Sequence, residues 1–149
     1  MLYREVQSFE PWIMWVLRAI MIATAGILGA VMLPIAPITA IVSILVIVGA
    51  QLLIEVIRLV VEIRPEEIKV GLRPYHWRHI PRADIESAKI IDYGFIGGYG
   101  IRYTSTYGTV YNARGRTGVQ LELVSGKRVV IGIQDELKAQ AALATFMAG

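Results

Sequence analysis

Cysteine is absent from this chain of 149 residues, and a long stretch near the N-terminus carries no charged side chain. Without cysteine the chain has no disulfide framework, no thiolate metal site and no cysteine nucleophile. The uncharged stretch extends from Ala19 to Ile54. A run of about 18 or more apolar residues is typical of a membrane-spanning segment. The chain is therefore neither one soluble globule nor a disordered protein.

Two prolines, Pro34 and Pro37, interrupt the uncharged stretch near its middle. Proline is unfavourable inside a helix, so these positions predict a tight turn between two apolar helices. We expect one helix over residues 11–33 and a second over residues 37–58. The uncharged parts of these helices are only about 22–26 Å long, against a hydrocarbon core of about 30 Å. A hairpin that dips into the bilayer without crossing it is therefore the alternative topology.

The two ends of the predicted hairpin carry charged and aromatic side chains typical of a membrane interface. These interface residues are Trp12, Trp15, Arg18, Glu55 and Arg58. Arg18 and Glu55 lie at similar distances from the turn, so an antiparallel hairpin brings them to similar depth. We expect them to form an ion pair, the alternative being that each points separately to water.

Small residues recur at four-residue spacing in the first predicted helix. They include the pairs Ala25 with Gly29 and Gly26 with Ala30. Such spacing lets helix backbones approach closely in lipid. The pattern predicts close packing, either between the two helices of one hairpin or between subunits.

The remaining sequence differs sharply in composition. We expect residues 1–56 to form the membrane hairpin and residues 57–149 to form one small domain. The second part carries thirteen basic and nine acidic side chains. This mild excess suits a surface facing anionic lipids and is too weak to predict nucleic-acid binding. By the positive-inside rule, we expect both termini of a multi-pass protein to lie in the cytoplasm. The expected location is the cell inner membrane.

Residues after position 57 alternate between apolar and polar side chains, which is typical of strands. A Ser-Gly pair at 125–126 separates two such segments and predicts a tight hairpin. We expect about seven antiparallel strands in an all-β barrel, capped by a C-terminal helix that ends near Met147. Strands and helices do not alternate, which argues against a parallel nucleotide-binding sheet.

Several short motifs follow one another in this second part. They are Ile80-Pro81-Arg82-Ala83-Asp84-Ile85, Gly98-Tyr99-Gly100-Ile101-Arg102, Val110-Tyr111-Asn112-Ala113-Arg114-Gly115, Gly118-Val119, and Gly126-Lys127-Arg128 followed by Ile131-Gly132-Ile133. Their order resembles the bacterial PH-like domains that follow two transmembrane helices in small membrane proteins. The resemblance implies a bent, seven-stranded PH-like barrel closed by its C-terminal helix. It implies binding or assembly, with no known chemistry.

One departure from lipid-binding PH domains concerns the loop of the first predicted hairpin. Those domains usually place lysines and arginines there to hold inositol phosphates. Here the loop reads Arg64-Pro65-Glu66-Glu67, and two carboxylates repel a phosphate. We therefore do not expect phosphoinositide recognition in that mode.

A basic and aromatic cluster spans residues 73–82. Its candidate headgroup-binding residues are Arg73, Trp77, Arg78 and Arg82. Arginines bind phosphate and tryptophan favours the membrane interface, so the cluster can contact anionic lipid. The alternative is a solvated strand pair with Trp77 in the core.

A second cluster, rich in glycine and aromatic residues, spans residues 93–111. Its candidate surface residues are Tyr93, Phe95, Tyr99, Tyr103 and Tyr107. Aromatic side chains are enriched at protein interfaces, so this segment is a candidate surface for a partner or a second subunit. The alternative is that alternate tyrosines belong to the core.

No combination of nucleophile and base predicts catalysis. We expect no enzyme activity, no catalytic residue, no metal and no cofactor. The predicted function is a membrane-anchored binding or assembly module that self-associates. The alternatives are an accessory subunit of a larger membrane complex, such as a transporter or membrane protease, or a module that binds anionic lipid. Expected partners are membrane lipids and either further copies of the chain or another membrane protein, without nucleic acid.

Overall fold

A computed structural model describes all 149 residues, which form two compact units. The helical unit comprises Glu10–Ile57, and the β-rich unit comprises Met1–Phe9 together with Arg58–Gly149. The first nine residues thus belong with the β-rich unit, whereas we expected residues 1–56 to form the hairpin alone. The reason is strand β1 (Tyr3–Gln7), which pairs with the strand that follows the second helix.

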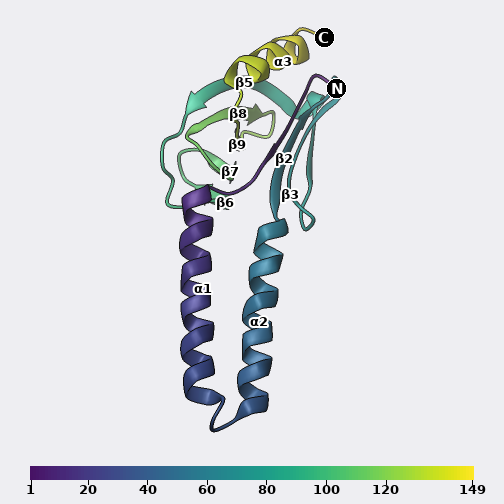
Figure 1. Cartoon of the computed structure of the whole chain (residues 1–149). Helices are drawn as coiled ribbons and strands as arrows, with labels where there is room; N and C mark the ends of the chain where they lie inside the picture. The colour runs from purple at the N-terminus through teal and green to yellow at the C-terminus, as the bar shows by residue number, and fades with distance from the viewer. The chain divides into compact units, whose positions relative to one another are not determined.

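Two helices make up the helical unit, α1 (Pro11–Met32) and α2 (Pro37–Val56), joined by a short turn (Figure 1). Each begins with a proline in its first turn, where the missing N–H costs nothing. At 1.5 Å per residue they are about 33 and 30 Å long, close to the thickness of a hydrocarbon core. Both are long and apolar enough to span a membrane.

Nine strands form two sheets, and neither sheet closes into a barrel. The first sheet has the order β1-β2-β3-β4, with β2 (Arg58–Ile63), β3 (Glu67–Arg73) and β4 (Arg78–Pro81). The second has the order β5-β8-β9-β7-β6, with β5 (Ile85–Asp92), β6 (Gly100–Thr104), β7 (Gly108–Asn112), β8 (Thr117–Leu123) and β9 (Arg128–Gly132). A short 3-10 helix, Arg82–Asp84, links them.

These sheets correct the expectation of about seven antiparallel strands in a barrel. Strand β1 was missed because five residues of mixed polarity before an apolar helix carry too little periodicity to indicate a strand. Strands β7 and β9 pair in parallel, so the second sheet is mixed. That pairing joins two strands that are separated along the chain by β8. The alternation of apolar and polar side chains within each strand does not indicate which strands pair.

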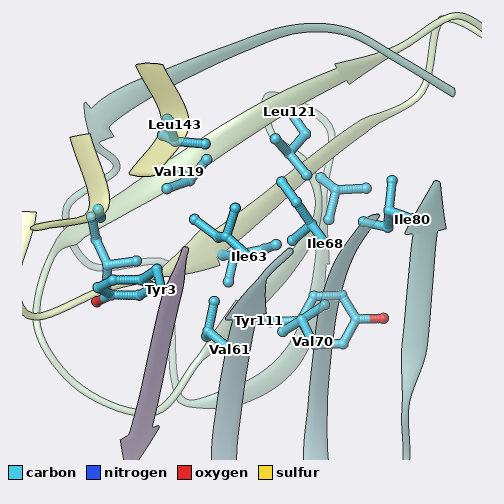
Figure 2. Packing of buried hydrophobic residues seen from close by; sticks show 14 of the residues in the cluster. Tyr3, Val61, Ile63, Ile68, Val70, Ile80, Tyr111, Val119, Leu121 and Leu143 are labelled. Atoms are coloured by element: carbon cyan, nitrogen blue, oxygen red, sulfur yellow. The ribbon is translucent and has the colours of Figure 1, made fainter. Parts of the chain in front are cut away.

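One hydrophobic core is shared by the two sheets and by helix α3 (Glu136–Ala148). Figure 2 shows apolar side chains of both sheets converging on Ile63 and Ile68, with Tyr3 and Leu143 at the same core. Helix α3 contributes Ala139, Ala142, Leu143 and Phe146, a spacing that places them along one face. The predicted C-terminal helix is therefore present and covers the core next to β5 (Figure 1).

The helical unit is inserted between two strands that pair with each other. Gln7 lies opposite Leu59, and Tyr3 lies opposite Ile63, so the end of β1 and the start of β2 are neighbours. Only residues 8–10 separate β1 from α1, and only Ile57 separates α2 from β2. The hairpin therefore occupies the position of a β-hairpin loop, with a short connection on each side.

Candidate functional site

A polar cluster joins the two helices near the ends that connect to the strands. Arg18 Nε lies 2.8 Å from Glu55 Oε1, which confirms the predicted ion pair. Gln51 Nε2 donates to the same carboxylate oxygen at 2.8 Å. The Arg18 guanidinium also lies 5.3 Å from the centre of the Trp15 ring, within the range of a cation–π contact. The cluster links α1 to α2 in a stretch that is otherwise apolar.

The other predicted interface residues lie at the surface. Trp12 and Trp15 are both exposed in the first turns of α1, the arrangement expected of an interfacial aromatic belt. Arg58 is exposed at the start of β2, opposite Arg73 of β3. Their position with respect to a bilayer stays a prediction.

The small residues of α1 face two directions. Gly29 is buried, and a Cβ built there meets the Ile44 side chain of α2 at 3.7 Å, so this glycine lies against the partner helix. Ala25 lines the groove between the helices. Gly26 and Ala30 are exposed, with open space around a Cβ built at Gly26. One pair thus serves packing within the hairpin, and the other leaves a smooth outer face.

The predicted headgroup-binding residues do not form one continuous surface. Arg73 lies over the Trp77 ring, 5.8 Å from its centre, and both residues are exposed. Trp77 therefore does not belong to the core. Arg78 is half-buried and lines a different hollow.

Arg82 has a structural role at the end of α3. Its Nη2 donates to the main-chain carbonyl of Met147 at 3.1 Å, and its guanidinium lies 5.4 Å from the centre of the Phe146 ring. Phe146 is one of the most deeply buried side chains in the protein. The arginine thus holds the C-terminal turn of α3 over the core.

The aromatic segment divides between surface and interior. Phe95 and Tyr103 are 76% and 82% exposed. Tyr93 is buried, and it forms a small cluster on the second sheet together with half-buried Tyr107. Tyr99 is half-buried. Phe95 and Tyr103 therefore fit the predicted partner surface, whereas Tyr93 fits the alternative that some tyrosines of the segment are core residues.

Tyr93 lies across a pair of facing glycines. Gly118 of β8 is opposite Gly132 of β9, and Cβ atoms built there come within 2.8 Å and 3.0 Å of the tyrosine ring and hydroxyl. The glycines thus leave room for the ring on the sheet. Burial raises the pKa of Tyr93 to about 12, with smaller contributions from Tyr99 and Asp92. Its hydroxyl has no hydrogen-bond partner.

The N-terminal strand anchors the start of α3, a contact that the sequence did not predict. The Glu5 carboxylate accepts from the main-chain N–H of Gln134 at 3.0 Å and also from the Tyr3 hydroxyl. Burial, followed by this hydrogen bond, raises the pKa of Tyr3 above its usual value. Asp135 then caps the helix by accepting from the Lys138 N–H at 3.1 Å. The Glu5 contact spans most of the chain, so no local pattern reveals it.

Two further residues were not predicted as members of a site. Lys127 and Arg128 flank the tight turn before β9, and they line the hollow that also contains Arg78. Their spacing in sequence gives no indication of this, because β4 and β9 lie in different sheets.

Comparison with protein-family models, with curated proteins and with solved structures finds no match to this chain. The chain therefore consists of two apolar helices near the N-terminus, inserted in sequence into a β-rich unit of two sheets and a C-terminal helix.

Proposed function

We propose that this protein is a non-enzymatic binding and assembly module, held at the cytoplasmic surface of the inner membrane by its helical hairpin. The observation that carries the proposal is the insertion of the hairpin between the paired strands β1 and β2. Both ends of the hairpin continue within a few residues into neighbouring strands. Such a double attachment keeps a small domain close to the membrane in which its helices lie.

Self-association is part of the proposal, and strand β6 supports it. This strand is the last in its sheet, so the hydrogen-bonding groups along its outer edge have no strand partner. Exposed edges of this kind are templates for pairing with another chain. Exposed Ile101 and Tyr103 lie on β6, and exposed Phe95 lies in the loop before it. Apolar and aromatic side chains beside an open edge favour a protein partner.

The helices offer a second surface for the same purpose. Most apolar side chains of α1 and α2 are exposed, and Gly29 and Ala40 are their only buried residues. Lipid covers such a surface equally well, so the small pair Gly26 and Ala30 is the informative feature. It lets the backbone of a second helix approach closely.

The PH-like assignment belongs to this proposal. Support for it comes from strands built mainly as antiparallel neighbours around one shared core, and from a C-terminal helix packed on that core. The proposed topology, with both termini cytoplasmic, rests on the concentration of basic residues in the β-rich part and their absence from the turn.

The experiment that tests the proposal is to determine the mass of the purified single chain in mild detergent and in nanodiscs, with imaging of the particle. We expect a homogeneous particle of several subunits. The variant Phe95→Ser/Ile101→Ser should lower its mass, because it removes apolar side chains beside the β6 edge.

The matched control is Val124→Ser/Leu137→Ser, which replaces two exposed apolar side chains away from β6 and should leave the mass unchanged. A monomer that enlarges only when other membrane proteins are added contradicts self-association. That result favours the accessory-subunit function instead.

A further inference from the structure

A hollow of about 580 Å³ opens at the end of the β-rich unit where β4, β7 and β9 begin. The starts of β7 and β9 meet there because these two strands run in parallel. The two chains approach closely: a Cβ at Gly108 would come within 2.2 Å of the Arg128 carbonyl oxygen. Only glycine fits at this point, so the shape of the hollow is built into the backbone.

Three cationic side chains line the hollow, and no carboxylate does. They are Arg78 from β4, and Lys127 and Arg128 from the turn into β9. The hydroxyl residues Tyr103, Ser105 and Thr109 complete the lining. Cations together with hydroxyl donors form the side-chain set that binds oxoanions.

The cations of the hollow are poorly neutralised by the protein itself. Arg78 is half-buried, and neither its side chain nor that of Lys127 makes an ion pair or hydrogen bond within the chain. Arg128 donates to the Thr106 carbonyl at 3.0 Å, and its nearest carboxylate, that of Glu122, is 4.0 Å away. A half-buried guanidinium without a partner costs free energy unless an anion binds it.

A second hollow, along β1 and α3, provides the contrast. Its Lys138 lies 2.7 Å from Asp135, and Glu5 there accepts main-chain hydrogen bonds. In that hollow, the carboxylates of Asp135 and Glu5 are themselves part of the lining and offset its positive charge. In the hollow at β4, β7 and β9, only Arg128 has a carboxylate nearby, that of Glu122 at 4.0 Å, and the Arg78 and Lys127 side chains have none.

We propose that the hollow lined by Arg78, Lys127 and Arg128 binds a phosphate group carried by a small molecule or a lipid headgroup. Arg78 and Lys127 supply the charge that pairs with the phosphate, and the hydroxyls orient it. The volume falls in the range of small-molecule sites, about 300–1,000 Å³. It therefore accommodates the group that carries the phosphate as well as the phosphate itself.

The test uses the full chain in phosphatidylcholine nanodiscs, with inorganic phosphate as the probe and equilibrium dialysis as the measurement. We expect saturable binding that weakens at least about tenfold in Arg78→Gln and in Lys127→Gln, because each removes a charge-assisted hydrogen bond. Lys89→Gln is the matched control. It removes the same charge from β5, at the opposite edge of the sheet from β6, and should bind phosphate like the unmodified protein.

A second arm distinguishes the two sources of phosphate. In nanodiscs that also contain phosphatidylglycerol, an unchanged affinity for inorganic phosphate assigns the site to a soluble ligand. A strongly reduced affinity assigns it to a lipid headgroup that competes. The proposal is overturned if phosphate does not bind saturably in phosphatidylcholine nanodiscs, or if all variants bind it equally.

Discussion

Tyr93 and Tyr103 belong to the same aromatic segment, yet one is buried and the other is almost fully exposed. The difference arises from their neighbours across the sheet. Gly118 and Gly132 leave room that the Tyr93 ring occupies, whereas Tyr103 lies on an edge strand with nothing packed over it. Residue type alone cannot distinguish the two positions.

The buried tyrosine makes the unfolding free energy depend on alkaline pH. Its pKa is about 12 in the folded protein, against about 10 when exposed. The folded state therefore favours the neutral form of the Tyr93 hydroxyl. The resulting stabilisation of the folded protein is fully present below pH 10 and is lost as the pH rises from 10 to 12. Two pKa units correspond to about 3 kcal/mol. We expect Tyr93→Phe to lose that much less stability than the unmodified protein over this range.

Denaturant unfolding followed by circular dichroism between pH 9 and pH 12 measures the effect. Tyr103→Phe is the control and should follow the unmodified protein, since its hydroxyl is exposed in both folded and unfolded states. If the free energy of unfolding of Tyr93→Phe and of the unmodified protein changed in parallel with pH, burial would not raise the pKa of the Tyr93 hydroxyl. At pH 8 the variant should be at least as stable, because the hydroxyl it lacks had no partner.

At the scale of secondary-structure elements, helices α1 and α2 are joined by apolar packing and by one polar cluster. Prolines at both ends of the turn set the helix boundaries, which sequence analysis predicted within about two residues. The Arg18–Glu55 pair followed from the antiparallel arrangement alone. Element boundaries and this contact were predictable because each depends on one hairpin and its local geometry.

The ion pair should contribute modestly to the stability of the hairpin. Both side chains remain about one-third exposed, at 39% and 32%, and pairs of this kind contribute about 0.2–1 kcal/mol. We expect a double-mutant cycle of Arg18→Gln and Glu55→Gln to give a coupling free energy in that range. The measurement is detergent-induced unfolding of the four proteins in micelles. Additive effects of the two substitutions would mean that the contact contributes nothing.

Helix α3 illustrates an element whose ends depend on distant residues. Glu5 accepts the hydrogen bond at its start, and Arg82 donates to Met147 at its end. The helix itself, with its end near Met147, was predicted from the sequence. The hydrogen bonds at its two ends were not predicted, because their partners lie on β1 and on the link between the sheets.

At the scale of the whole molecule, the chain is a β-rich unit interrupted by a helical hairpin. Because Gln7 and Leu59 are paired neighbours, a two-residue Asn-Gly turn can join them in place of residues 8–58. We expect this shortened protein to be soluble without detergent and to keep the β-rich circular dichroism of the full chain. An insoluble or unfolded product would show that the helices are required for the β-rich unit to fold.

The control for this experiment is residues 59–149 alone, which lack strand β1. That fragment loses Tyr3 from the core, the hydrogen bond from Gln7 Nε2 to the Gly132 carbonyl and the Glu5 contact with α3. It should be less stable than the joined protein by several kcal/mol, as expected for losing a large buried side chain and a strand. Equal stability of the two proteins would mean that β1 is not part of the folding unit.

Local sequence patterns were enough to predict the two apolar helices, the turn between them, most of the later strands and the C-terminal helix. These features depend on periodicity, proline and charge, which act over neighbouring residues. Three features became visible only in the folded chain: Tyr3–Gln7 forms a strand with β2, β7 pairs with β9, and Arg78 lines the same hollow as Lys127 and Arg128. Those contacts join distant segments through burial and backbone hydrogen bonding, and no local pattern specifies which distant segments will meet.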